Sequence, residues 1–233
     1  GTLTGAGTLT LGGASIWTGG TMAGTGATVI AAGATLTLSG TGYQYLEGRT
    51  LDDAGTVTWT GGNWYGSDGA AIVIQAGGLL DDQNPTNHSL RYDYYGGGER
   101  PLVTIEAGAT FRKSGAGDAY LYDVIFANAG TVEVDQGTLA LSEIYGGGSG
   151  THSGTFDIRS GATLDFGSGT HTLTAGSRIQ GAGTLEVSGG TLEIGADVAT
   201  SAGFSLTGGT LTGAGTLTLG GASIWTGGTM AGT

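Results

Sequence analysis

The side chains that could do chemistry in this chain are mostly carboxylates, and two adjacent pairs stand out. Asp52–Asp53 and Asp81–Asp82 could serve as general acid and general base in a hydrolysis. Neighbouring side chains on a strand point to opposite faces, so the two carboxylates of one pair would not converge on one substrate. Both pairs also lie where a short alternating segment is expected to turn a corner. The pattern favours solvated corner aspartates, and we predict that the chain is not an enzyme.

Four other acidic side chains are expected to point outward from strands, where they could bind a cation loosely if they stack on one another. They are Glu133, Asp165, Glu186 and Glu193. The repetitive calcium-binding pattern Gly-Gly-x-Gly-x-Asp is not met, because the segments from Gly61 and from Gly115 have the wrong spacing. We therefore predict no cofactor and no built metal site, with loosely bound Ca²⁺ as the only cation, and interpret these acids as a charged face that favours solubility.

The aromatic residues are distributed unevenly along the chain. All nine tyrosines lie between Tyr43 and Tyr145, and the densest group falls in the segment 81–100, which departs most from the surrounding pattern. Tyrosines flanked by charged and polar groups suit stacking on sugars or contact with a partner protein. The predicted ligand or partner patch comprises Tyr92, Tyr94, Tyr95, Arg91, Asp93, Tyr120, Tyr122 and Tyr145. The alternative is that the tyrosines pack on one another to close over an enlarged coil.

Composition excludes several classes of protein. The 233 residues include 52 glycines and 2 prolines, with 38% hydrophobic and 11% charged residues, which does not fit a helical protein, collagen or a charged disordered chain. Seven basic residues against 19 acidic ones give a net charge of −12, so nucleic acid is not an expected partner. The chain lacks cysteine, which excludes disulfides and thiolate chemistry. No apolar run reaches the roughly 18 residues of a membrane helix, so no membrane insertion is expected.

The elements that would position these side chains are short strands that follow small-residue corners. One motif is an apolar residue, then any two residues, then Ala-Gly-Thr and strict alternation, as in the segments from Leu51, Phe126 and Ile179. A sister motif has Gly-Ala-Thr at the same place, as in the segments from Ile30 and Ile105. Alternation with a period of two indicates a strand with one buried face, and glycine supplies a tight corner.

The motifs recur at intervals of about 20 to 30 residues, the range typical of solenoid repeats. We predict an all-β fold, a parallel β-helix in which each coil covers the apolar face of its neighbour. Trp17, Trp59 and Trp225 lie in strand-like contexts and are expected in the core. The alternative is an antiparallel sandwich, but Asp68–Gly69 is the sole hairpin signal of the Asn-Gly or Asp-Gly type.

A second, longer repetition is visible at the two ends of the sequence. Residues 1–25 recur without a change at 209–233, which defines a super-repeat of 208 residues. We predict that 1–233 is one continuous β-solenoid, that 1–208 is one tandem unit of about nine or ten coils, and that 209–233 begins the next. With coils about 4.8 Å apart, one unit would be a rod of about 45 Å.

Several phrases of this sequence resemble the β-strand repeats of giant bacterial surface proteins. GAGTLTL, AAGATLTLSG, ASIWTGGTMAGTG and DDAGTVTWTGGN are similar to repeats in autotransporter passengers and filamentous-haemagglutinin-like adhesins, and the likeness covers most of the chain. The resemblance implies a right-handed β-helix, as the crossover rule also favours, at the cell surface or outside a bacterium. It predicts a structural module that stacks end to end with copies of itself in a fibre or stalk. The alternative is an adhesin or glycan-binding module acting through the tyrosine-rich segments between 43 and 145.

A polysaccharide-degrading β-helix is a third alternative. Pectinase-like enzymes would carry a Gly-His-Gly and an Arg-Ile-Lys-type pair, and none of His88, His152 and His171 lies in Gly-His-Gly. Arg178-Ile179-Gln180 is the nearest approach to the second pattern. The sequence therefore does not predict polysaccharide degradation. Polysaccharide or other surface polymers are candidate binding partners of the tyrosine-rich segments, beside tandem copies of the chain itself.

Overall fold

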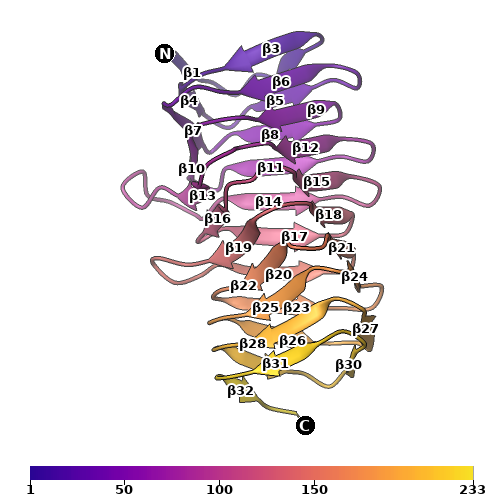
Figure 1. The fold of residues 1–233 in the computed structure, drawn as a ribbon. Helices are drawn as coiled ribbons and strands as arrows, with labels where there is room; N and C mark the ends of the chain where they lie inside the picture. The colour runs from indigo at the N-terminus through magenta and orange to yellow at the C-terminus, as the bar shows by residue number, and fades with distance from the viewer. Residues whose placement is uncertain (233) are drawn as a thin grey trace.

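The chain winds into a stack of about eleven coils. The computed structural model describes residues 1–232, which contain 32 short strands, and the described part of the chain contains no helix (Figure 1). All strand pairings are parallel, and every pairing joins strands that are three places apart in the chain. The prediction of a parallel β-helix is therefore confirmed, and the antiparallel sandwich is excluded.

Each coil contributes one strand to each of three faces, which we call A, B and C. Face A contains β1 (Thr2–Leu3), β4 (Gly20–Ala23), β7 (Tyr43–Glu47), β10 (Asn63–Ser67), β13 (His88–Tyr92), β16 (Ala119–Tyr122), β19 (Thr138–Ser142), β22 (Thr163–Phe166), β25 (Thr184–Val187), β28 (Gly203–Leu206) and β31 (Ser223–Trp225). Face B contains β2 (Leu9–Leu11), β5 (Ala27–Ile30), β8 (Thr50–Asp53), β11 (Ala71–Ile74), β14 (Leu102–Ile105), β17 (Ile125–Asn128), β20 (Ser149–His152), β23 (Thr170–Leu173), β26 (Thr191–Ile194), β29 (Thr210–Thr212) and β32 (Thr229–Met230). Face C contains β3 (Ala14–Trp17), β6 (Thr35–Leu38), β9 (Thr56–Trp59), β12 (Leu79–Asp82), β15 (Thr110–Lys113), β18 (Thr131–Val134), β21 (Thr155–Ile158) and β24 (Arg178–Gly181), and continues through contact of β24 with the pair β27 (Val198–Thr200) and β30 (Leu217–Leu219).

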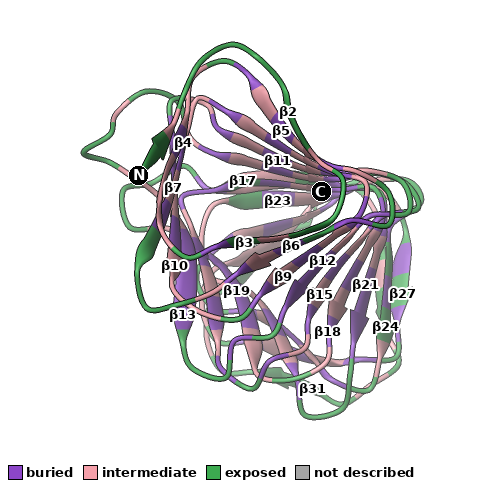
Figure 2. Ribbon diagram, turned by 90° about the horizontal axis from the view of Figure 1, so that it is seen from above, coloured by how far each residue is buried: buried purple, intermediate pink, exposed green. Residues whose placement is uncertain are grey.

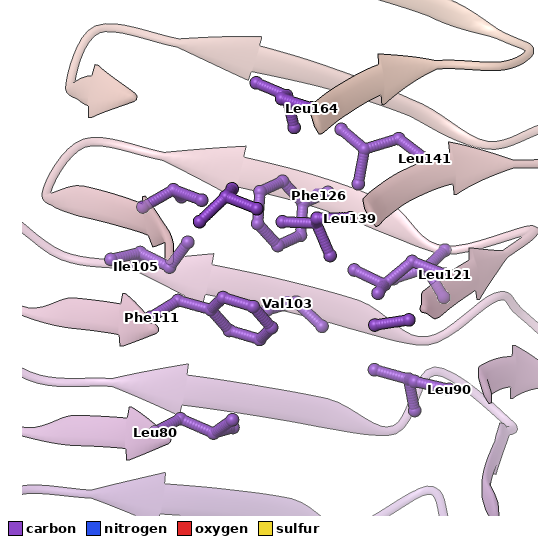
Figure 3. Packing of buried hydrophobic residues seen from close by; sticks show 14 of the residues in the cluster. Leu80, Leu90, Val103, Ile105, Phe111, Leu121, Phe126, Leu139, Leu141 and Leu164 are labelled. Carbon is purple, nitrogen blue, oxygen red and sulfur yellow. The ribbon is translucent and has the colours of Figure 1, made fainter. Parts of the chain in front are cut away.

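The core is the inside of this three-faced tube. Along β18, Val132 and Val134 are buried while Thr131 and Glu133 face outward, as the period-two pattern predicts. Figure 2 shows buried residues along the strands of all three faces, and Figure 3 shows side chains from the three faces meeting in the interior. Because registers are kept, Val132 lies between Phe111 and Phe156 of the adjoining coils. Each buried side chain of this size stabilises the fold by about 1.5–3 kcal/mol.

The two corner motifs need glycine for different reasons. In the Gly-Ala-Thr corner, Gly33 has φ of +80°, a conformation that other residues rarely adopt. In the Ala-Gly-Thr corner, a Cβ on Gly55 would lie 2.5 Å from the carbonyl oxygen of Ala31 in the preceding coil. The second corner thus fits directly onto the first, and the 21-residue spacing of their motifs is one coil.

The tryptophans show where a coil is covered. Trp17 and Trp59 are buried, as predicted, and Trp64 joins them in the core with its ring 5.9 Å from each of theirs. The prediction for Trp225 is wrong, because this side chain is 59% exposed. It lies on β31, and no further strand of the described residues stacks beyond β31 on face A.

The described residues contain no helix of the length and apolar character that would cross a membrane.

A buried arginine ties the first three coils together. Arg49 follows β7 at a corner, and its Nε donates to the Thr28 hydroxyl at 2.9 Å. Its two terminal nitrogens donate to four backbone carbonyl oxygens, two in the first coil and two in the second, those of Gly5, Gly7, Ala23 and Ala27. The guanidinium thus meets hydrogen-bond acceptors throughout but no carboxylate within ion-pair distance among the described residues.

Arg49→Met should keep most of the side-chain volume while removing every donor of this clamp. The loss should lower the free energy of unfolding by about 1–3 kcal/mol in urea denaturation, because the buried Thr28 hydroxyl and the carbonyl oxygens of Ala23 and Ala27 lose a donor, whereas those of Gly5 and Gly7 lie at exposed residues. Arg178→Met is the matched control, because Arg178 is exposed and its replacement should change stability by less than about 0.5 kcal/mol. Equal, small losses in both variants would contradict a role for the clamp.

Candidate functional site

Five of the nine tyrosines lie on the outer side of face A, on β7, β10 and β16, and Arg91 of β13 lies between them. We call this surface the tyrosine face; its members are Tyr43, Tyr45, Tyr65, Arg91, Tyr120 and Tyr122. In the outward column, Tyr45 lies beside Tyr65, Tyr65 beside Arg91, and Arg91 beside Tyr122. Segments up to 80 residues apart in the sequence thus form one continuous aromatic surface.

The tyrosine face is largely packed on itself. The Tyr45 and Tyr65 rings stack with centroids 5.1 Å apart, and the Tyr120 and Tyr122 rings stack at 5.4 Å. The Arg91 guanidinium lies 4.3 Å from the centre of the Tyr65 ring and donates to its hydroxyl. Burial is the main reason that the pKa of Tyr45 and that of Tyr122 are raised. Mutual packing of the tyrosines, the alternative considered from the sequence, therefore describes this surface.

A groove lies beside the tyrosine face, at the corner between faces A and B. Two loops form it, 93–101 and 143–148, which project on the same side of the stack (Figure 1). Its volume is about 650 Å³, and its walls include Tyr92, Tyr94, Tyr145, Glu99 and Arg100. Unlike most of the tyrosine face, the loop tyrosines are open to solvent, with Tyr94 56% and Tyr95 93% exposed.

The groove is held by contacts between the two loops. Tyr94 stacks on Tyr145 with ring centroids 4.6 Å apart. Arg100 donates to the Gly146 carbonyl oxygen, and its guanidinium lies 5.2 Å from the centre of the Tyr92 ring. These contacts cross between loops of two different coils, so the groove wall is a built surface rather than a pair of independent loops.

Asp123 anchors the loop 143–148 through hydrogen bonds to its backbone. Its buried carboxylate accepts hydrogen bonds from the backbone N–H groups of Ile144 at 2.9 Å and Tyr145 at 3.1 Å. One of its oxygens is 4.0 Å from a terminal nitrogen of Arg100. Neither Asp123 nor Arg100 belonged to the patch predicted from the sequence. The position of Asp123 directly after a strand gave no signal, because Asp68, Asp93 and Asp135 also directly follow strands.

The structure divides the eight predicted patch residues into two neighbouring groups. Five of them line the groove or its rim, namely Tyr92, Tyr94, Tyr95, Tyr145 and Asp93. Arg91, Tyr120 and Tyr122 lie on the tyrosine face, and Arg91 also borders the rim. The groove and the tyrosine face meet at β13.

The interpretation of the paired aspartates as solvated corner residues is wrong for three of the four. Asp53, Asp81 and Asp82 are buried, and only Asp52 is half-exposed. The members of each pair do point to opposite sides, because Asp53 and Asp82 occupy inward positions in the ladders of faces B and C. Each takes the place that an isoleucine or tryptophan fills in the adjoining coil.

The inward aspartates are held by local hydrogen bonds. Asp53 accepts from the Gly55 N–H at 3.0 Å, and burial raises its pKa to about 6 despite that bond. Asp82 lies 2.8 Å from Nε2 of the buried His88, whose Nδ1 is 2.8 Å from the Thr86 carbonyl oxygen. The next inward position holds Lys113, whose pKa burial lowers.

Asp81, on the outer side of the same strand, is part of a different network. It accepts from Arg112 at 2.6 Å, from Ser114 at 2.6 Å and from Gln83 at 2.8 Å. Burial alone would raise the pKa of Asp81, but these hydrogen bonds outweigh it and leave that pKa lowered. The carboxylates of both pairs are therefore engaged in holding strands and corners, and none faces the groove.

The four acids considered for cation binding are spread over all three faces. Glu133 lies on face C, Asp165 and Glu186 are neighbours on face A, and Glu193 lies on face B. Burial, followed by the nearby Glu186, raises the pKa of Asp165, although Ser188 donates to it. Within residues 1–232 no three histidine or acidic side chains are grouped as metal ligands would be.

Two buried histidines form a feature that the sequence did not suggest. His152 Nε2 lies 3.2 Å from His171 Nδ1, and the rings stack 5.4 Å apart on adjacent strands of face B. Phe156 and Phe166 pack around them. Burial lowers the pKa of His152 to about 3 and that of His171 to about 4, so both are neutral at physiological pH.

Comparisons of the whole chain with protein-family models, with curated proteins and with solved structures found no match.

The histidine pair should make the fold sensitive to acid. In the unfolded chain both side chains take up protons as the pH falls through about 6.5, whereas the folded pair resists until about 4 and about 3, so stability is lost as the pH falls below 6.5. Between pH 7.5 and 5, His152→Leu/His171→Leu should lose about 2–4 kcal/mol less stability than the unchanged protein, measured by urea denaturation.

Asp53 provides a control, because its protonation changes the stability in the opposite direction as the pH falls. Its folded pKa of about 6 lies above the unfolded value, so its protonation adds stability as the pH falls through 6. Asp53→Asn should therefore make the loss between pH 7.5 and 5 steeper. Parallel pH profiles for all three proteins would contradict this assignment of the titrating groups.

Proposed function

We propose that this chain is a structural module of a giant extracellular bacterial protein, in which 208-residue units stack end to end as a fibre or stalk. One observation carries the proposal: the same residues are covered in one copy of the repeated segment and open in the other. Trp17 is 6% exposed and its equivalent Trp225 is 59% exposed, and the corresponding values for Met22 and Met230 are 9% and 44%. The segment 209–232 thus presents apolar side chains that fit a further coil.

The first copy shows which residues would cover them. Leu38 lies over Trp17 on face C, and Leu46 lies over Met22 on face A. A following unit would bring residues equivalent to these onto Trp225 and Met230, in the same order along the chain. The next coil is therefore specified by the sequence already present, which favours a second copy of this unit as the occupant of the open end.

The extracellular and bacterial setting is supported by the resemblance of the repeat phrases to those of surface proteins. The low share of charged residues and the net charge of −12 fit a rod whose surface is threonine-rich and mildly acidic. In such a rod the function is geometric, because each unit adds a fixed length and carries the loops of the groove away from its point of attachment.

Appending residues 26–208 of a second unit after Thr233 should bury Trp225. Its fluorescence, obtained as the difference between each protein and its Trp225→Phe variant, should shift to shorter wavelength, and its quenching by acrylamide should fall several-fold. Subtracting the spectrum of the Trp225→Phe variant removes the contribution of the other tryptophans. Unchanged quenching of Trp225 in the extended chain would contradict end-to-end stacking.

The groove supports a second candidate function, binding of a polysaccharide. Solvent-exposed tyrosine rings on a held wall, beside Glu99 and Arg100, offer apolar faces and polar groups to a sugar. This activity would be compatible with the first, since the loops project from the stack without interrupting its ladders.

Tyr94→Ser and Tyr145→Ser should each weaken retention on a polysaccharide column by tenfold or more, because each removes one ring of the stacked pair. Tyr43→Ser is the matched control, an exposed tyrosine outside the groove whose loss should leave binding unchanged. A panel of neutral and acidic polysaccharides gives the measurement. Equal effects of all three substitutions, or no binding to any polymer, would contradict this function.

A further inference from the structure

The two copies of the repeated segment occupy different faces of the solenoid. In the first copy β1, β2, β3 and β4 lie on faces A, B, C and A. Their equivalents β29, β30, β31 and β32 lie on faces B, C, A and B. All four strands have advanced by one face, so the difference belongs to the whole segment and not to one strand at its edge.

The local structure of the segment is the same in both positions. Thr2 and Leu3 pair with Thr21 and Met22 in the first copy, and their equivalents Thr210 and Leu211 pair with Thr229 and Met230 in the second. The Thr-Gly-Gly corner also recurs with a positive φ at its last glycine, +94° at Gly20 and +73° at Gly228. It joins face C to face A in one copy and face A to face B in the other. The same corner sequence therefore serves at two different corners of the coil.

The strand count explains the advance. Twenty-eight strands separate β1 from β29, and nine coils of three strands use 27 of them. One 208-residue unit is thus nine coils and one additional strand, in agreement with the nine or ten coils predicted from the sequence. The following unit starts one face later than its predecessor.

From this we infer that a tandem array presents its tyrosine face and groove on three different sides in turn. The inference rests on the proposed stacking of units. The groove lies between faces A and B in this unit, between B and C in the next, and between C and A in the third. Any rotation from coil-to-coil twist adds to this step. Three units, or 28 full coils, restore the starting face.

This arrangement determines the kind of partner that the array fits. A polymer chain running straight along one face of the rod meets the groove of every third unit. Separate polymer chains on different sides each meet their own set of grooves. The array is therefore suited to bridging several polysaccharide chains around its circumference. Units made of a whole number of coils would instead place every groove on the same side of the rod.

The face advance can be tested within the single chain, independently of tandem stacking. The chain has no cysteine, and outward Ser205 on β28 is the direct neighbour of Ile224 on β31. Under mild oxidation, Ser205→Cys/Ile224→Cys should form an intramolecular disulfide in most molecules. Ala199→Cys/Ile224→Cys is the control, because Ala199 lies on face C, where Ile224 would lie if the second copy kept the faces of the first. Crosslinking of the control pair instead would overturn the inference.

The array itself is tested by cryo-electron microscopy of a four-unit chain, with loops 93–101 and 143–148 as surface markers. We expect the markers of successive units to move by one face of the cross-section. A continuous rod with all markers on one face would overturn the inference while leaving the stacking intact. The absence of a continuous rod would remove the stacking on which the array depends, and the disulfide result would then stand for the single unit alone.

Discussion

In-register stacking of each strand on the strand one coil earlier is the constraint on which the rest of this structure depends. No coil has a core of its own, since an inward side chain such as Val132 is covered by Phe111 on one side and Phe156 on the other. Stability is then close to a sum over neighbouring coils. A further coil adds the same contacts as the coil before it. A repeated sequence can therefore extend the fold without any new type of contact.

Buried polar groups interrupt the inward ladders in the middle of the stack and fix their register. Asp53, Asn128 and His152 stand in the ladder of face B, and Asp82 and Lys113 in that of face C. Asn128 donates to the Thr155 carbonyl oxygen and His152 contacts His171, each in the next coil. A slip by one coil would separate these pairs, at a cost of about 1–3 kcal/mol for each buried group left unpaired. Apolar ladders of leucine, valine and isoleucine alone would tolerate such a slip more readily.

The sequence predicted the strands, the corners and the coil count because these follow from local patterns. Alternation in segments such as 131–134 indicates a strand with one buried face, and the glycine corners mark where each strand begins. Burial of Asp81 was missed because Arg112 and Ser114, which donate to it, come from the next coil. Burial of Asp53 and Asp82 was missed because a carboxylate at an inward position gives no sign of the local donors, Gly55 and His88, that hold it. The exposure of Trp225 was also missed, because it depends on whether a further coil covers β31 and not on the local pattern. The face advance of the repeat was missed because it depends on the number of strands in the unit, which corners of irregular length make difficult to count.

The site could be predicted only in part for a related reason. The clustering of tyrosines along the chain indicated one patch, and the structure places them on one face and at one adjoining groove. Their division between self-packed rings and open rings depends on Arg100 and Asp123, which join loops of different coils. Contacts of this kind have no signature in the spacing of residues along one segment.

The most direct measurement of the central claim is electron microscopy of chains with one, two and four 208-residue units over a range of concentrations. Stacked coils about 4.8 Å apart predict a rod that lengthens by about 45 Å per unit, independently of concentration. Compact particles, or rods whose length does not increase with the number of units, would contradict the account.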